Sequence, residues 1–161
     1  MSEPVQRPYF DANALVKYYH DEKGSLNIRR LVSNTPNPIM VSSLTILECI
    51  SVVMGYYRKS FLKQKHFKSI FQRLRKDAAS QNTQNRPFEI IPIPDKGFRL
   101  AEKILFQYAR IFQISSNDAL HLAIVKEVQS PFSPLLVTSD NSMQKVCERI
   151  SIPFYDPEIE E

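Results

Sequence analysis

Residues 7–19 read RPYFDANALVKYY, in which a short run of β-forming residues ends in an acid and passes into a helical pattern. The pattern predicts a strand over residues 7–11 and a helix over residues 13–19, with Asp11 at the junction between them. In α/β folds the groups that carry chemistry lie at this place, just beyond the carboxyl end of a strand. Asp11 is therefore the first candidate functional residue.

Three further acids lie at comparable junctions. Residues 135–140 read LLVTSD, so that Asp140 closes a second predicted strand. Asp118 follows serines that can cap a helix ending near Val128, and Glu48 lies early in a helix predicted from Leu44 to about Tyr57. Carboxylates gathered at one edge of a sheet repel one another unless a cation lies among them. Their oxygen ligands suit Mg²⁺ or Mn²⁺, so the pattern indicates a divalent metal site.

The remaining elements alternate in the same way. Further strands are predicted at residues 39–41, 88–93 and 152–155, the last at a sheet edge because it contains a proline, and Asp95 can cap a helix that ends near Phe112. Strands that alternate with helices and short apolar runs predict a mostly parallel sheet covered on both faces. We therefore expect an α/β protein with a central sheet between helices, formed by a single domain over residues 1–161.

Each acid also has a purely structural explanation. Asp11 and Asp140 could cap the helices that follow them. Glu48 stands three residues after Thr45, at the spacing of a capping box, and Asp118 could stabilise its helix through the macrodipole. One such acid is weak support for a site, but four in one chain are stronger support, because their order fits a shared edge.

Other residues capable of chemistry are explained by packing. His121 lies one helical turn beyond Asp118 and could face the site, but a core position or a backbone hydrogen bond is the commoner role for such a histidine. Cys49 and Cys147 each fall within an apolar helical pattern, without a second Cys or His at zinc spacing. We interpret both cysteines as small buried hydrophobic residues.

The composition describes an ordinary globular protein, with 43% hydrophobic and 24% charged residues and a net charge of +4. No run approaches the roughly 18 apolar residues of a membrane helix, and the first residues lack the order of a secretion signal. We expect a cytoplasmic protein that does not contact membranes. The positive net charge favours a polyanionic partner.

Positive charge concentrates between Arg58 and Lys76, where eight Lys or Arg residues occur without an acid. This basic run could follow the phosphates of a nucleic acid. It could equally be the solvated face of a helix over residues 60–79, whose apolar residues form one stripe. A polar segment to residue 87 follows, so residues 58–87 are expected to form a basic helical extension and an exposed loop. The candidate phosphate contacts are Lys63, Lys65 and Lys68.

Four segments together resemble the successive signatures of PIN-domain ribonucleases, and most closely those of the VapC-like toxins. They read FDANALVK, SLTILE, DALHLA and LVTSD, at residues 10–17, 43–48, 118–123 and 136–140. Their order and approximate spacing match over nearly the whole chain. The resemblance implies a central parallel sheet between helices, a Mg²⁺ or Mn²⁺ site, and an endoribonuclease that hydrolyses RNA. It also implies a toxin that forms a homodimer and is inhibited by an antitoxin.

The resemblance assigns a role to each acid: Asp11, Asp118 and Asp140 would be metal ligands, and Glu48 the fourth catalytic carboxylate, acting directly or through a water. Residues 58–87 form a longer insertion than small toxins of this kind usually carry.

Two neighbouring residues would support the acids. Thr138 matches the hydroxyl that the family places two residues before the last acid. Asn13 stands where the family has Ser or Thr, and its amide could hold Asp11 by a hydrogen bond.

Two alternative functions remain open at this level. A Mg²⁺-binding signalling module could use an acidic pocket at the same edge, although such modules need a pair of acids after the first strand, and here only Asp11 closes it. A PIN-like scaffold could bind RNA or a protein without cutting. A DNA-directed nuclease of the same fold is a further possibility, because metal chemistry at phosphate does not distinguish the sugar.

Overall fold

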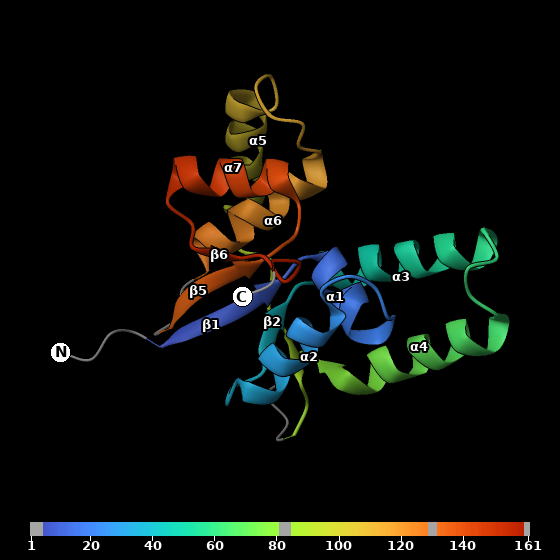
Figure 1. Ribbon diagram of the computed structural model, residues 1–161. Helices are drawn as coiled ribbons and strands as arrows, with labels where there is room; N and C mark the ends of the chain where they lie inside the picture. The colour runs from blue at the N-terminus through green and yellow to red at the C-terminus, as the bar shows by residue number, and fades with distance from the viewer. Residues whose placement is uncertain (1–4, 81–84, 129–131, 160–161) are drawn as a thin grey trace.

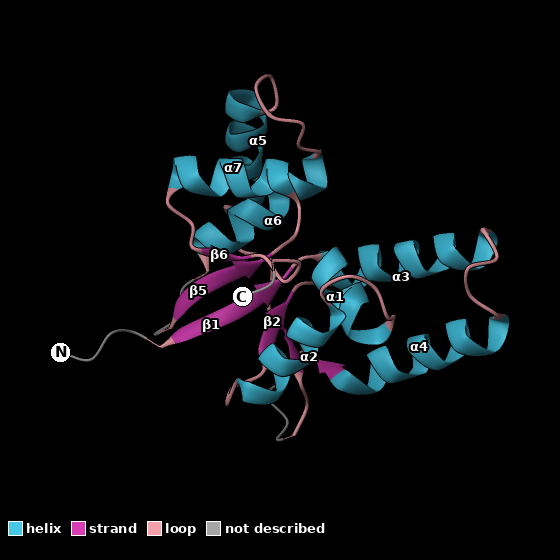
Figure 2. Ribbon diagram, viewed as in Figure 1, coloured by secondary structure: helices cyan, strands magenta, loops and turns pink. Residues whose placement is uncertain are grey.

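A computed structural model describes residues 5–80, 85–128 and 132–159. Its centre is a parallel six-stranded sheet with strand order β3-β4-β2-β1-β5-β6, shown in magenta in Figure 2. The four residues 81–84 of the expected polar loop lie outside the described residues. The strands are β1 (Gln6–Phe10), β2 (Ile39–Val41), β3 (Ala78–Ala79), β4 (Phe88–Ile90), β5 (Ser133–Val137) and β6 (Phe154–Tyr155).

Helices cover the sheet on both faces, as Figure 1 shows. The helices α1 to α4 lie on one side and α5 to α7 on the other. Among the described residues, no helix is long and apolar enough to cross a membrane. The helices are α1 (Ala12–Tyr19), α2 (Ser25–Asn34), α3 (Ser43–Arg58), α4 (Gln64–Asp77), α5 (Gly97–Tyr108), α6 (Ser116–Glu127) and α7 (Asn141–Ile150).

Alternation along the central strands creates the three layers. Tyr9 and Leu136 belong to the core beneath α5 to α7, whereas their neighbours Phe10 and Val137 belong to the core beneath α1 to α4. All four side chains are fully buried. Successive side chains of a strand point to opposite faces, so continuous apolar strands require helices on both sides. The structure therefore confirms the expected three-layer α/β fold.

Several predicted boundaries were wrong for local reasons. The strand predicted to end at residue 93 ends at Ile90, and Pro92 beyond it has no N–H with which to extend the ladder. Asp95 does not cap α5, because the N-cap is Lys96, without a side-chain hydrogen bond. The long basic helix begins at Gln64 instead of residue 60, because Ser60 has φ of 62° and ends the preceding turn. Phe61 is consequently exposed and does not join the apolar stripe.

Candidate active site

Strand pairing brings the first and last acids to one edge of the sheet. β1 and β5 pair in parallel with Phe10 opposite Val137, and the Asp11 N–H donates to the Val137 carbonyl at 3.4 Å. Asp11 is the N-cap of α1, and its Oδ1 accepts the Ala14 N–H at 2.9 Å. Asp140 is likewise the N-cap of α7, with Oδ1 accepting the Met143 N–H at 3.0 Å. The predicted capping roles of both residues are confirmed, and capping places both carboxylates at the carboxyl edge.

The other two acids come from helices. Asp118 forms a capping box with Ser115, in which each side chain accepts the backbone N–H of the other residue. The capping box predicted for Glu48 was wrong, because Ser42 and Thr45 form the box at the start of α3. Glu48 lies one turn further along the helix, so its carboxylate is free of any capping duty and reaches toward α6.

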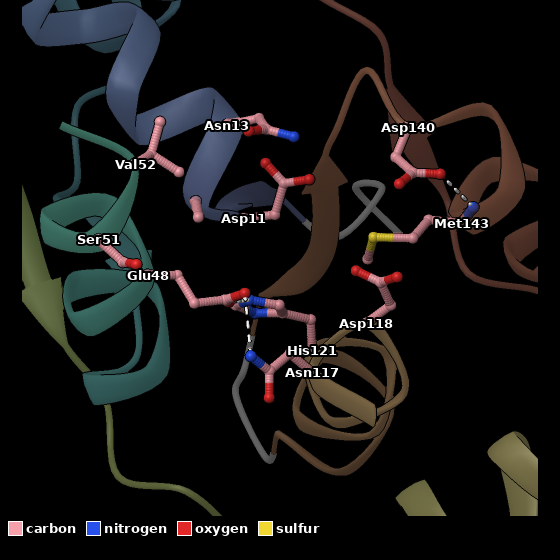
Figure 3. A pocket seen from close by; sticks show the side chains of 11 residues that line it. Asp11, Asn13, Glu48, Ser51, Val52, Asn117, Asp118, His121, Asp140 and Met143 are labelled. Atoms are coloured by element: carbon pink, nitrogen blue, oxygen red, sulfur yellow. Dashed lines mark hydrogen bonds and ion pairs between the residues drawn. The ribbon is translucent and has the colours of Figure 1, made fainter. Parts of the chain in front are cut away.

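All four acids line one pocket of about 220 Å³. Figure 3 shows the three aspartates around one side of it, while Glu48 extends from α3 toward Asn117 and His121. The remaining wall is formed by small or polar side chains and one thioether, which include Asn13, Ser51 and Met143. The fold thus unites the four predicted acids, three from the starts of α1, α6 and α7 and one from the second turn of α3.

The aspartates repel one another in this pocket. Asp11 is 4% exposed, and burial raises the pKa of its carboxyl, as does the nearby charge of Asp140. Hydrogen bonds from Thr138 and from the Ala14 N–H oppose that rise in pKa. Burial also raises the pKa of Asp118, with Asp140 again adding to the effect. A bound cation would relieve the cost of keeping these carboxylates ionised.

The donor set suits a hard divalent cation, but the side chains are not arranged around one. Among the described residues, no group of three or more His, Cys, Asp or Glu side chains is placed to hold a metal ion. Each aspartate has one oxygen committed to a backbone N–H at a helix start, and like charges favour separation. The free oxygens are the ones that could turn toward an ion between the three elements.

The two supporting residues fare differently. Thr138 is buried. Its hydroxyl hydrogen-bonds the Asp11 carboxylate and accepts the Asp140 N–H at 3.1 Å, so Thr138 links two of the acids. The hydrogen bond expected between Asn13 and Asp11 is not formed among the described residues. Asn13 points outward from the first turn of α1 and lines the pocket rim, since Ala14 and Thr138 already supply the partners of Asp11.

His121 was expected to pack in the core or to hydrogen-bond a backbone group. The core position is confirmed, but the hydrogen bonds of the ring go to side chains. The ring is buried, yet Nε2 lies 2.5 Å from Glu48 Oε1 and Nδ1 lies 2.8 Å from the Tyr9 hydroxyl. Asn117, which sequence reasoning missed, donates to Glu48 Oε2 at 3.2 Å. The available signal was the four-residue spacing of Asn117 and His121, which places both on one helix face.

The basic run lies apart from the pocket. All eight of its Lys and Arg residues are exposed, from the last residue of α3 through α4, and none lines the acidic pocket. Ile70 and Leu74 on the opposite face of α4 are buried against the α1 side of the core. The amphipathic helix is therefore confirmed, while the role of Lys63, Lys65 and Lys68 stays a prediction.

Comparison with known proteins agrees with this geometry. Residues 9–149 match the PIN domain family. No curated protein shows significant sequence similarity to the chain.

Solved structures share the fold at low identity. FitAcB from Neisseria gonorrhoeae is 17% identical with a TM-score of 0.62, over 93% of this chain and 97% of that chain. VapBC2 from Rickettsia felis, bound to a promoter DNA fragment, is 19% identical with a TM-score of 0.59, over 92% and 97%. VapC20 from Mycobacterium tuberculosis, described as a Sarcin-Ricin loop cleaving toxin, is 12% identical with a TM-score of 0.59, over 86% and 93%.

These identities support the fold and no finer assignment. The family match, in contrast, extends from within β1 into α7 and includes all four acids of the pocket. This protein therefore belongs to the PIN domain family.

Proposed function

We propose that this protein is a metal-dependent endoribonuclease that hydrolyses RNA phosphodiester bonds and acts as the toxin of a toxin-antitoxin pair. The observation that carries the proposal is the convergence of Asp11, Glu48, Asp118 and Asp140 on one pocket of a PIN domain. A divalent cation, Mg²⁺ or Mn²⁺, would supply a nucleophilic water at neutral pH and shield charge on the phosphoryl oxygens.

The residues of the pocket have different roles in the proposed reaction. Asp11, Asp118 and Asp140 provide the negative charge that retains the cation, each with an oxygen not used in capping. Glu48, whose side chain is 26% exposed, lies within reach of solvent and can orient the attacking water or accept its proton. Thr138 and Asn13 support the site, the first through its bonds to two acids and the second as a polar group at the rim.

The basic run supports a nucleic acid as the substrate class. A single-stranded RNA that enters an acidic pocket needs attraction elsewhere along its path, because the carboxylates repel its phosphates. Lys63, Lys65 and Lys68 are exposed cations outside the pocket and would provide that attraction. They would hold the backbone without taking part in the chemistry.

Partner proteins are supported by two different observations. One structure with the same fold is a toxin-antitoxin complex from Klebsiella pneumoniae, which supports an antitoxin partner for this chain. Phe98, Phe106 and Ile111 on or beside α5 are 60%, 79% and 65% exposed, and this exposure of large apolar side chains supports a homodimer that would bury them. Light scattering of the purified protein, with and without Phe106→Glu, tests the dimer.

The nuclease proposal is tested with purified protein on a panel of structured RNAs, with Mg²⁺, with Mn²⁺ and with excess EDTA. Cleavage should require the ion. Asp11→Asn and Asp118→Asn should each remove cleavage, because the amide keeps the shape of the side chain but not its charge. Glu102→Gln is the matched control, since Glu102 is exposed on α5 and lies outside the pocket.

Full cleavage by either variant, or by the wild type in EDTA, would overturn the proposed mechanism. RNA binding without any cleavage would support the non-cutting scaffold. The toxin assignment is tested separately: induced expression of the wild type should arrest bacterial growth, and expression of Asp118→Asn should not.

A further inference from the structure

The carboxylate of Glu48 is held at both oxygens by one helix. His121 Nε2 lies 2.5 Å from Oε1, and Asn117 Nδ2 donates to Oε2 at 3.2 Å. Asn117 and His121 are four residues apart on α6, so they project from the same face toward α3. The three-residue contact fixes both the direction and the rotation of the Glu48 carboxylate (Figure 3).

The other ring nitrogen of His121, Nδ1, is also hydrogen-bonded. It lies 2.8 Å from the Tyr9 hydroxyl, and that hydroxyl lies 2.8 Å from Ser42 Oγ. Tyr9 and Ser42 are fully buried, and His121 is 2% exposed. Burial shields these contacts from bulk water, so each hydrogen must be assigned within the chain itself.

The protons of this chain can be placed in one consistent order. Glu48, as a carboxylate, only accepts, so His121 donates from Nε2. In the neutral form of the ring, Nδ1 then accepts from the Tyr9 hydroxyl. The Tyr9 oxygen then accepts from Ser42, whose oxygen accepts the Thr45 N–H at 3.3 Å. Every buried side-chain N or O among the described residues has a partner, in agreement with this order.

We infer that Asn117 and His121 are positioning residues that clamp the Glu48 carboxylate at the mouth of the pocket, with His121 locked in the Nε2–H tautomer by Tyr9. The inference rests on the proposed function. A glutamate in a partly exposed position would otherwise sample many rotamers, and the clamp removes that freedom before the substrate arrives. Neither residue needs to touch the RNA or the cation.

The tautomer is tested first, on metal-free wild-type protein without RNA. Long-range ¹H–¹⁵N correlation of the His121 ring at neutral pH should show a protonated Nε2 and an unprotonated Nδ1. Tyr9→Phe keeps the aromatic ring but removes the hydroxyl, and Glu48→Ala removes the acceptor. Each variant should shift the His121 ring signals and relax the tautomer preference. A ring protonated on Nδ1, alone or together with Nε2, would overturn the assigned tautomer, and signals unmoved by Glu48→Ala would overturn the clamp.

Kinetics then test the positioning role. Loss of a group that orients a catalytic carboxylate typically costs about 10- to 100-fold. We expect a loss of that size in kcat for His121→Leu and Asn117→Ala, with KM for RNA nearly unchanged. His121→Gln can still donate an amide N–H toward Glu48 and should recover part of the loss. Asn34→Ala, at the exposed end of α2, is the matched control.

Different results would overturn the positioning role and the proposed nuclease function. Folded His121→Leu and Asn117→Ala proteins with wild-type kcat would overturn the positioning role while leaving the nuclease intact. A wild type that cleaves no RNA would overturn the proposed function together with the positioning role built on it, although the NMR result would still decide the geometry. Asn117→Ala is the decisive variant if His121→Leu does not fold, because Asn117 is exposed.

Discussion

The acidic pocket and the basic run carry opposite charge and are built in opposite ways. In the pocket, the aspartates are tied to helix starts by backbone hydrogen bonds, and Glu48 is held by two side chains of α6. Along the basic run, all eight cations are exposed, and none forms an ion pair within the part of the chain that the structure describes.

The contrast separates the residues proposed for catalysis from the residues proposed to attract the nucleic acid. Catalytic groups must be held within fractions of an ångström, which requires burial and hydrogen bonds. Charges that attract a polyanion act through a long-range field and lose little when their side chains move. Substitutions in the pocket should therefore act on rate, and substitutions on α4 should act on binding and its dependence on salt.

The largest effect is expected for Asp140→Asn. Asp140 adds negative charge beside both Asp11 and Asp118, and its removal should weaken the hold on the cation. A loss of about 4 kcal/mol of transition-state stabilisation corresponds to a rate decrease on the order of 10³-fold. Single-turnover cleavage with saturating Mn²⁺ measures the decrease. Asn is also a good N-cap, so α7 should remain folded, as circular dichroism would verify.

A smaller effect, on binding alone, is expected when Lys63, Lys65 and Lys68 are all replaced by Gln. The slope of log K against log salt should flatten by about 0.7 for each phosphate of a single strand that the variant no longer neutralises. Filter binding of the catalytically inactive Asp118→Asn protein, with and without the three substitutions, measures the slope. An unchanged slope would mean that α4 is simply a solvated helix, and reduced kcat at saturating RNA would mean that the separation between pocket and basic run is wrong.

Asp11→Asn should stabilise the metal-free protein. The folded pKa of Asp11 is raised, so its stabilising effect is complete below the unfolded pKa of about 3.9 and is lost as pH rises through the folded value. Asn carries no charge, so the variant should melt above the wild type at neutral pH in EDTA, and the gap should close toward acid pH. Calorimetry in EDTA measures both trends. A melting temperature below that of the wild type at neutral pH would contradict the proposed repulsion.

The smallest effect is expected for Ser115→Ala, which removes half of the capping box that holds Asp118. Loss of such a cap costs about 1 kcal/mol, or roughly 2–4 °C in Tm for a protein of this size. Thermal melting measures it, with Ser116→Ala as the control because Ser116 is not the cap. A change of Tm equal in both variants would show that the serines act only through helix propensity.

Local patterns were sufficient to predict most of the elements. The capping hydrogen bonds of Asp11, Asp140 and Ser115 join residues only three positions apart. Such bonds can be read from spacing alone. The errors concern Asp95 and Asn13: the N-cap of α5 is Lys96, which has no side-chain cap hydrogen bond, and Asp11 accepts the backbone N–H of Ala14.

By itself the sequence determined that strands and helices alternate, that acids stand at their junctions, and that residues 58–76 carry a basic run without an acid. Only the tertiary structure decided that Glu48 is clamped by Asn117 and His121, and that Tyr9 stands behind His121. The physical reason is distance along the chain: Glu48 and His121 are 73 residues apart, and Tyr9 and His121 are 112 apart. No local spacing encodes contacts of that kind, because they form only when the fold brings β1, α3 and α6 together at the same edge of the sheet.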